Sequence, residues 1–127
     1  MEKLIIETNS APRALGPYSQ GVIIGQWFFV SGQLGLDPAT GKLAGGGAAH
    51  EADRALKNIE AILKAGGSGM DQVVKVTLYL RDMGHFSEVN DVFSRYFISR
   101  PPARAAVGVA DLPRDALVEI EAQACIE

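Results

Sequence analysis

The feature that most constrains the fold of this 127-residue chain is a change of hydrophobic period in its first half. Residues 18–24 and 27–33 are rich in β-branched and aromatic side chains, which predicts two strands joined by a turn at Gly25-Gln26. From 48 to 65, apolar residues recur instead at helical spacing, and Gly66-Gly67 ends the pattern. The chain therefore combines a sheet with helices, and its predicted class is α/β.

The rest of the chain continues this alternation of strands and helices. A second helix is predicted near residues 85–97, with Asp82 as a candidate cap. The other predicted strands are 3–7, 73–80, 103–110 and 117–126. The order is then β-β-β-α-β-α-β-β. Because two helices can cover only one face of a six-stranded sheet, we expect the other face to be open.

Length and composition indicate one domain, residues 1–127, with no linker or repeat. The chain is 47% hydrophobic and 21% charged, which is typical of globular proteins and argues against disorder. A net charge of −3 without a basic run disfavours a nucleic-acid partner. No apolar run approaches the roughly 20 residues of a membrane span. The single cysteine, Cys125, excludes an intrachain disulfide, and with no export signal we expect a cytoplasmic protein.

Alternation along the strands divides their side chains between two faces. We expect the helices to pack on the more apolar set, which is Val118, Ile120, Ala122, Ala124, Ile126, Val74, Val76, Leu78, Leu80, Ala103, Ala105, Val107 and Val109. The opposite set mixes charged, polar, aromatic and small residues, among them Tyr79, Arg104, Ala106 and Glu119. A mixture of this kind suits a subunit interface or a ligand cleft, and an ordinary solvent-exposed face is the alternative.

Most familiar catalytic constellations are missing from the sequence. His50 and His85 are 35 positions apart and have no partner at metal-ligand spacing. There is no Gly-x-Ser-x-Gly nucleophile motif, and the three glycines at 45–47 lack the lysine of a phosphate-binding loop. Cys125 has no evident activating group, so we interpret it as an inert thiol.

Arg104 and Glu119 remain as the candidates for chemistry. A guanidinium can hold a carboxylate by two parallel hydrogen bonds, and a nearby glutamate can orient or deprotonate a water or protonate a leaving amine. The alternative is a structural ion pair that includes Glu121. The residue pattern alone leaves both possibilities open.

Several blocks of sequence resemble one known family. Residues 102–121 read PARAAVGVADLPRDALVEIE, which is similar to the C-terminal signature of the Rid family of reactive-intermediate deaminases, also called the YjgF family. The stretches 16–21 (GPYSQG) and 31–33 (SGQ) resemble its N-terminal blocks. Further matching positions are Leu56, Asn58, Ile62, Leu63, Gly66, Asp82, Phe86 and Asn90. The resemblance covers nearly the whole chain.

This resemblance implies a chorismate-mutase-like α/β fold and a homotrimer in which the sheets form a central barrel with the helices outside. It implies active sites in clefts between subunits. The implied reaction is the hydrolysis of 2-enamine and 2-imine acids, such as 2-aminoacrylate and 2-iminobutanoate, to 2-keto acids and ammonia. No metal or organic cofactor is expected, because a protonated imine is already electrophilic and needs mainly orientation and a placed water.

The resemblance also implies roles for individual residues. Arg104 matches the arginine that binds the substrate carboxylate, and Glu119 matches the acid that positions the attacking water. The positions that match pocket-lining residues are Tyr18, Ser31, Gly32 and Asn90, and Glu121 is expected to be structural.

The chain also departs from the family pattern. Ala106 stands where many deaminase members carry a cysteine, so a nucleophilic cysteine cannot operate here. Phe93 replaces a frequent tyrosine, and the segment between Phe97 and Pro102 is shorter than usual. These differences are expected to affect the pocket and its specificity.

Two other functions compete with the deaminase hypothesis. One is a non-catalytic trimer that binds a small keto or amino acid. The other is an RNA-cleaving translation inhibitor, an activity ascribed to some relatives, against which the negative net charge weighs.

Overall fold

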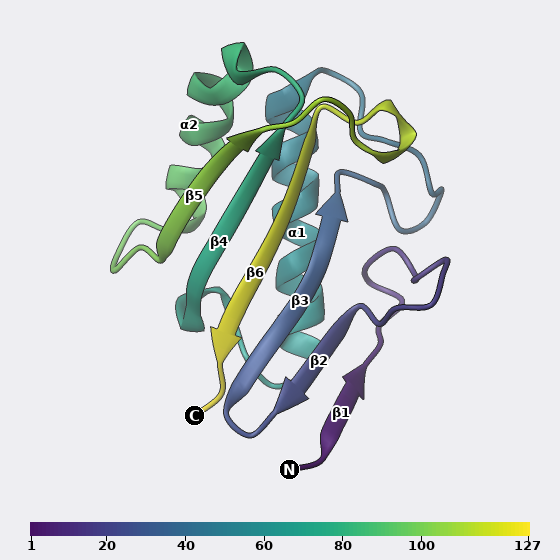
Figure 1. Cartoon of the computed structure of the whole chain (residues 1–127), viewed down its shortest axis with the longest axis vertical. Coiled ribbons are helices and arrows are strands. Elements are labelled where there is room, and N and C mark those ends of the chain that lie inside the picture. The colour runs from purple at the N-terminus through teal and green to yellow at the C-terminus, as the bar shows by residue number, and fades with distance from the viewer.

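A computed structural model describes all residues, 1–127. Its six strands and two α-helices occur in the predicted order (Figure 1). The elements are β1 (Lys3–Ile6), β2 (Gly21–Ile24), β3 (Trp27–Leu34), α1 (Ala48–Ala65), β4 (Val73–Leu80), α2 (Phe86–Tyr96), β5 (Ala103–Gly108) and β6 (Val118–Cys125). Short 3-10 turns lie at Met70–Gln72, Met83–His85 and Pro113–Asp115.

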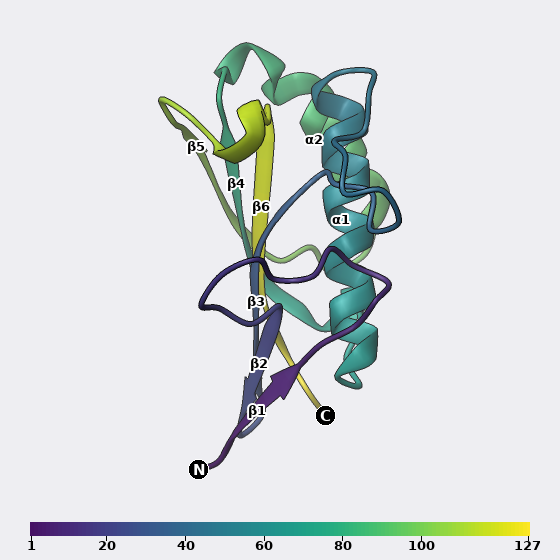
Figure 2. The same ribbon diagram turned by 90° about the vertical axis from the view of Figure 1, so that its right-hand side faces the viewer.

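The strands form one mixed sheet in the order β1-β2-β3-β6-β4-β5. Strands β4 and β5 run parallel, and the other neighbours are antiparallel. Strand β6, the last in the chain, lies in the middle between β3 and β4. Seen edge-on, both helices lie on one side of the sheet and the other side is uncovered (Figure 2). The predicted open face is therefore confirmed.

Helix α1 has the boundaries that the sequence predicts. Its apolar side faces the sheet, and its outer side carries the ion pairs Asp53–Lys57 and Glu60–Lys64, with N···O distances of 3.1 and 3.7 Å. The helix ends where the N–H of Gly66 reaches back to the carbonyl oxygens of Ile62 and Leu63 and Gly67 adopts φ 86°. A positive φ favours glycine, which explains why the helix stops there.

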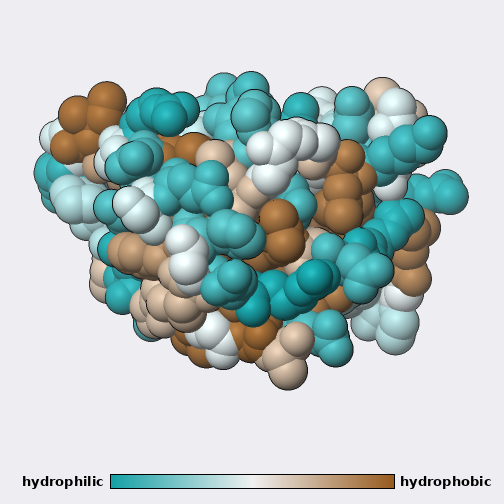
Figure 3. All heavy atoms as spheres, turned by 90° about the horizontal axis from the view of Figure 1, so that it is seen from above, coloured by the Kyte–Doolittle hydropathy of each residue, from teal (hydrophilic) through white to brown (hydrophobic).

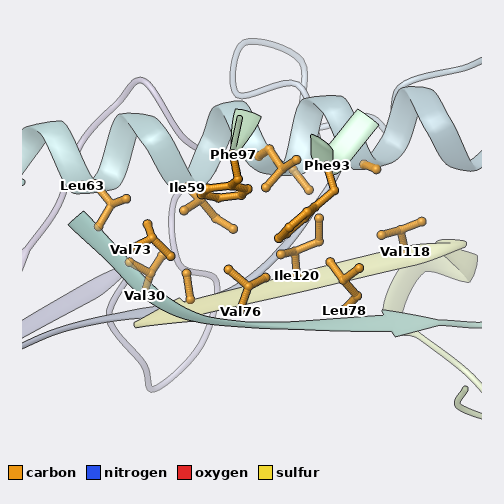
Figure 4. Packing of buried hydrophobic residues seen from close by; sticks show 14 of the residues in the cluster. Val30, Ile59, Leu63, Val73, Val76, Leu78, Phe93, Phe97, Val118 and Ile120 are labelled. Atoms are coloured by element: carbon orange, nitrogen blue, oxygen red, sulfur yellow. The ribbon is translucent and has the colours of Figure 1, made fainter. Parts of the chain in front are cut away.

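A core cluster of 23 buried residues joins the helices to the sheet. Figure 4 shows Ile59 and Leu63 of α1 above Val30, Val76 and Ile120 of the sheet. Phe93 and Phe97 pack onto the same layer, with ring centroids 4.6 Å apart. The strands and helices that the sequence pattern predicts are thus held together by one continuous apolar layer.

The predicted strand at residues 18–24 starts later, at Gly21. The buried side chain of Gln20 explains the difference. Its amide accepts a hydrogen bond from the N–H of Thr8 and donates to the carbonyl oxygens of Ala11 and Pro12. Since these contacts hold residues 8–12 against Gln20 as an irregular loop, the ladder with β3 begins only after it.

One face assignment in β4 is wrong. Val74 was expected to face the helices, but its side chain is exposed and Val73 is buried instead. The pairing with β6 shifts register between Val73 and Lys75. An irregularity of this kind reverses which side chains face the helices on one side of it. The predicted assignment of side chains to the two faces therefore holds only from Lys75 onward.

The assignment in β5 is wrong along the whole strand. Ala103, Ala105 and Val107 are exposed, whereas Ala106 packs against the core. The register pairs Arg104 with Val76 and Ala106 with Leu78, and both partners are buried under the helices. Arg104 and Ala106 therefore lie on the helix-covered face, opposite to the prediction. The pattern is misleading because the apolar set of this edge strand is small, and because the charged Arg104 lies against the rings of Phe86 and Phe93 on the covered face instead of in solvent.

Candidate functional site

Glu119 lies on the open face of the sheet, in β6, where it is half buried. Its carboxylate lies over Gly32 of β3, since a Cβ added at Gly32 would meet Glu119 Oε2 at 2.0 Å. Gly32 occupies a β-bulge, because the pairing of β3 with β6 shifts register between Val30 and Gln33. The absence of a side chain at this bulge makes room for the carboxylate.

Burial raises the pKa of Glu119, and the negative charge of Glu121 adds to the effect. Both carboxylates project from the same face of β6, two residues apart. Glu121 in turn accepts a hydrogen bond of 2.6 Å from Tyr79 Oη of β4. Glu121 is thus anchored by a neighbour, whereas Glu119 has no hydrogen-bond or ion-pair partner in the chain. A half-buried carboxyl with a raised pKa and free oxygen atoms is suited to exchanging protons with a water or an amine.

Arg104 lies at the other edge of the sheet, in β5, beneath helix α2. Its Nη1 donates a hydrogen bond of 2.7 Å to Asn90 Oδ1. The guanidinium carbon lies 4.9 Å from the ring centroid of Phe93 and 5.4 Å from that of Phe86. Two aromatic rings and one amide therefore fix the orientation of the guanidinium without neutralising its charge.

Arg104 and Glu119 lie on opposite faces of the sheet, which corrects the expectation that they share one. Their partners in β4 are Val76 and Tyr79, three residues apart, with β4 between the two strands. Strand spacing and rise then place their Cα atoms roughly 14 Å apart. Within one chain they therefore form no ion pair and cannot meet on one small molecule. The predicted alternative of a structural ion pair is also wrong.

Of the other predicted site residues, one lies beside Arg104 and the rest lie on the side of Glu119. Asn90 joins Arg104 beside a cavity of about 440 Å³ that Phe93, Phe97 and Pro102 also line. Tyr18 and Gly32 line a different cavity, of about 650 Å³. Ser31 precedes Gly32 in β3, and its hydroxyl donates to the carbonyl oxygen of Ser19, which fixes the loop that carries Tyr18.

The larger cavity contains two residues that the sequence analysis did not identify, Arg13 and Arg114. They come from the segments 9–18 and 113–114, which meet the end of β3 and the loop that follows it, residues 32–41. Figure 3 looks onto the end of the molecule where β3, β4 and β5 finish, and it shows apolar patches between hydrophilic side chains. Arg13 and Arg114 come together only because these segments pack against one another, so their spacing in the sequence does not predict a shared cavity.

Metal-binding clusters and membrane-spanning helices are two further features that bear on function. No group of three or more histidine, cysteine or acidic residues is arranged to hold a metal ion. Neither helix has the length and apolar character needed to cross a membrane.

The chain is similar to known proteins along almost its whole length. The family model described as Endoribonuclease L-PSP matches residues 8–126. A bovine protein (Bos taurus) named 2-iminobutanoate/2-iminopropanoate deaminase is 55% identical over 93% of this chain and 86% of its own length.

Two solved structures show the same fold. A RidA protein from the Antarctic bacterium Psychrobacter is 42% identical, with a TM-score of 0.93 over 97% of this chain and 99% of that one. The E. coli protein TdcF, solved with bound serine, is 38% identical, with a TM-score of 0.93 over 98% and 99% of the two chains. The predicted chorismate-mutase-like α/β fold is confirmed. The chain belongs to the Endoribonuclease L-PSP family, which is the Rid (YjgF) family that its sequence blocks resemble.

Proposed function

We propose that this protein hydrolyses 2-imino acids, and the 2-enamino acids that tautomerise to them, at a site shared between two copies of the chain. A water oxygen bonds to the imine carbon, the C–N bond breaks, and a 2-keto acid and ammonia leave. The names of the deaminase relatives support this reaction class. The serine bound to TdcF shows that this relative accepts a small amino acid.

The observation that carries the proposal is the free guanidinium of Arg104. Its hydrogen bond goes to an amide oxygen of Asn90, and no carboxylate of the chain pairs with it. A fixed, uncompensated guanidinium at a cavity is a good binding site for a small carboxylate. In this proposal Arg104 binds the substrate carboxylate, and Asn90 and the aromatic rings hold it in place.

Glu119 supplies the second function, the placement and activation of water. As a carboxylate it accepts a proton from the water that attacks the carbon of the protonated imine, and it then returns that proton to the amine nitrogen. As the C–N bond breaks and the C=O bond forms, the regenerated carboxylate accepts the remaining hydroxyl proton. Its raised pKa brings it closer to the range in which both steps are possible. Gly32, Ser31 and Tyr18 form the wall on this side. Since Ala106 has no nucleophilic side chain, the reaction proceeds through water.

The two groups must come from different protomers, because one chain holds them on opposite faces of its sheet. The substrate carboxylate and imine carbon are directly bonded, so their partners must converge within a few ångströms. The uncovered face exposes apolar side chains that a second sheet would bury, among them Ile5, Trp27, Phe29 and Val107. We propose that this face associates in a homotrimer with a central barrel of sheets.

A mixing experiment tests the shared site directly. Arg104→Ala and Glu119→Gln are each expected to abolish turnover of 2-iminobutanoate generated in situ by an amino-acid oxidase. When equal amounts of the two inactive variants are unfolded and refolded together, a shared site regains about a quarter of wild-type activity, because one random neighbour pair in four joins an intact arginine to an intact glutamate. No recovery would contradict the shared site.

Two controls accompany this measurement. Each variant is refolded alone, to show that recovery needs both, and circular dichroism checks that each keeps its fold. Arg104→Lys keeps the charge but loses the planar fork, so we expect it to remain strongly impaired. Retained activity of Arg104→Ala with a native spectrum would contradict the assigned role.

The name of the matched family makes RNA cleavage the second candidate function. A net charge of −3 disfavours binding to a phosphate backbone. Nuclease-free protein incubated with labelled RNA decides between them, since the deaminase proposal expects no cleavage. The binding-only alternative is decided by rate: if keto acid forms no faster than in buffer, the protein binds imino acids without hydrolysing them.

A further inference from the structure

The 650 Å³ cavity next to Gly32 has an unusual charge distribution for an acidic protein. Arg13 and Arg114 both line it, and none of its lining residues is an aspartate or glutamate. Neither arginine takes part in an ion pair, whereas Arg81 pairs with Asp115 close by. Two uncompensated guanidinium groups at one cavity attract an anion.

Arg114 is held in place by the backbone around it. It adopts φ 61° in the turn Pro113–Asp115, a conformation that costs a non-glycine residue energy. Its Nη1 donates a hydrogen bond of 2.9 Å to the carbonyl oxygen of Gly41 on the opposite loop, and Gly41 also lines the cavity. The guanidinium therefore spans two of the three loops that form the cavity.

The position of the cavity relates it to the reacting atoms. Gly32 lines it, and the Glu119 carboxylate lies over the same glycine. A substrate whose imine carbon reaches the water at Glu119 would direct its side chain along Gly32 and Tyr18 into this space. The rest of the lining includes apolar residues such as Leu15, Leu34 and Leu36, which suit methylene groups.

We propose that the preferred substrates carry a second carboxylate, as in the imines of glutamate and aspartate. The inference rests on the proposed deaminase function and adds the substrate class. Arg104 binds the carboxylate next to the imine, while Arg13 and Arg114 bind the distal one. The reaction balances as for any imine: water adds to the imine carbon, ammonia leaves, and 2-iminoglutarate becomes 2-oxoglutarate.

The test compares two imines made in situ, 2-iminoglutarate from glutamate and 2-iminobutanoate from 2-aminobutanoate, each by a suitable amino-acid oxidase. The wild-type protein is expected to favour 2-iminoglutarate in kcat/KM. Arg13→Gln and Arg114→Asn are each expected to lower the ratio of the two values about tenfold. Asparagine tolerates positive φ, so the Arg114 variant keeps its turn. Arg114→Lys should recover part of the ratio.

Arg95→Ala is the matched control. It removes the same charge from an exposed position of α2 outside the cavity and should leave the ratio unchanged. Calorimetry gives a readout independent of turnover: the two cavity variants should bind 2-oxoglutarate about tenfold more weakly, with a smaller change for 2-oxobutanoate.

The outcomes separate this inference from the proposed function. If the wild type hydrolyses 2-iminobutanoate efficiently but the Arg13 and Arg114 variants leave the ratio unchanged, the distal site is refuted and the deaminase proposal stands. A wild type that prefers 2-iminobutanoate also refutes the distal site. If the wild type accelerates neither reaction, the proposed function fails and the substrate class with it.

Discussion

The two faces of the sheet differ in what holds their side chains. On the covered face, Val76, Leu78 and Ile120 are packed beneath two helices and form one apolar cluster. On the open face, Tyr79 of β4 donates a hydrogen bond to Glu121 of β6, the charge of Glu121 acts on Glu119, and aromatic side chains such as Phe29 lie exposed. The covered face is fixed by packing within the chain. The open face carries polar and aromatic groups that no helix of the chain covers.

This contrast shows how one sheet can serve both stability and function. Apolar burial determines the covered face, so its residues tolerate little change in volume. The open face keeps a carboxylate with a raised pKa, which the folded chain alone does not need.

Neighbouring phenylalanines provide the strongest test. Phe28 is 0% exposed and Phe29 is 44% exposed, although they are adjacent in β3. Phe28→Ala should lower the free energy of unfolding by about 3–5 kcal/mol through the cavity it leaves. Phe29→Ala should weaken assembly rather than the fold of each chain.

Urea denaturation at several protein concentrations separates the two effects. The Phe28→Ala midpoint should fall at every concentration, whereas the Phe29→Ala shift should depend on concentration, and light scattering should show dissociation. Equal, concentration-independent losses in both variants would contradict the division between the faces.

Gly32→Ala should cause the next largest effect, on activity rather than stability. The added Cβ would lie 2.0 Å from Glu119 Oε2, so the carboxylate must move away from its position over the bulge. We expect about a hundredfold loss of kcat/KM, because catalytic geometry tolerates little displacement. Gly45→Ala is the control, since its Cβ would meet nothing within 4 Å. If both variants keep full activity, Glu119 does not act from this position.

The pH profile tests the raised pKa of Glu119. In the proposed mechanism the ionised carboxylate is the active form, so activity should rise with pH through that pKa. Glu121→Gln removes the negative charge that helps to raise the pKa of Glu119, so this limb of the profile should move toward lower pH. The shift should be partial, because burial, the larger cause of the raised pKa, remains. Glu60→Gln is a control far from the site, on the outer side of α1. An unchanged limb in Glu121→Gln would show that another group controls the profile.

Tyr96→Phe, on the covered side, should have the smallest effect. Tyr96 Oη donates a hydrogen bond of 2.6 Å to Asp53 Oδ1 and so joins α2 to α1. Burial raises the pKa of Asp53, but this bond and the contacts with Lys57 outweigh it and leave the pKa below its usual value. Because Asp53 is partly exposed, the expected loss of stability is about 0.5–1 kcal/mol at neutral pH.

The pH dependence of this loss has a definite sign. A carboxylate with a lowered pKa in the folded state stabilises the protein above its unfolded pKa, and the contribution is lost as the pH falls through the folded pKa. The difference between wild type and Tyr96→Phe should therefore shrink below about pH 4. A difference that grew on acidification would contradict the proposed bond to the carboxylate.

Much of the fold could be predicted from sequence because its signals are local. The boundaries of α1 and β4 agree with the prediction, and Asp82 caps a turn as expected, although that turn is 3-10 and precedes α2. The errors occur where the pattern is weak. In β5 the apolar set is small and the charged Arg104 packs against aromatic rings on the covered face, and the hydrophobic pattern does not signal the register shift at Val74.

For the candidate site, too, the sequence indicates residues but not their positions relative to one another. The family blocks indicate Arg104 and Glu119, but they do not reveal that the two lie on opposite faces, which depends on the orientation of an edge strand. The cavity with Arg13 and Arg114 was missed because three loops distant in sequence form it.

The sequence by itself determined the order of the elements, the mixed sheet with one open face and the family, since period, turn residues and matching blocks are all local features. Only the tertiary structure decided which way β5 faces, which groups remain unpaired and which loops meet around a cavity. These properties arise from contacts between distant segments, where register and packing, rather than local preference, determine the position of each side chain.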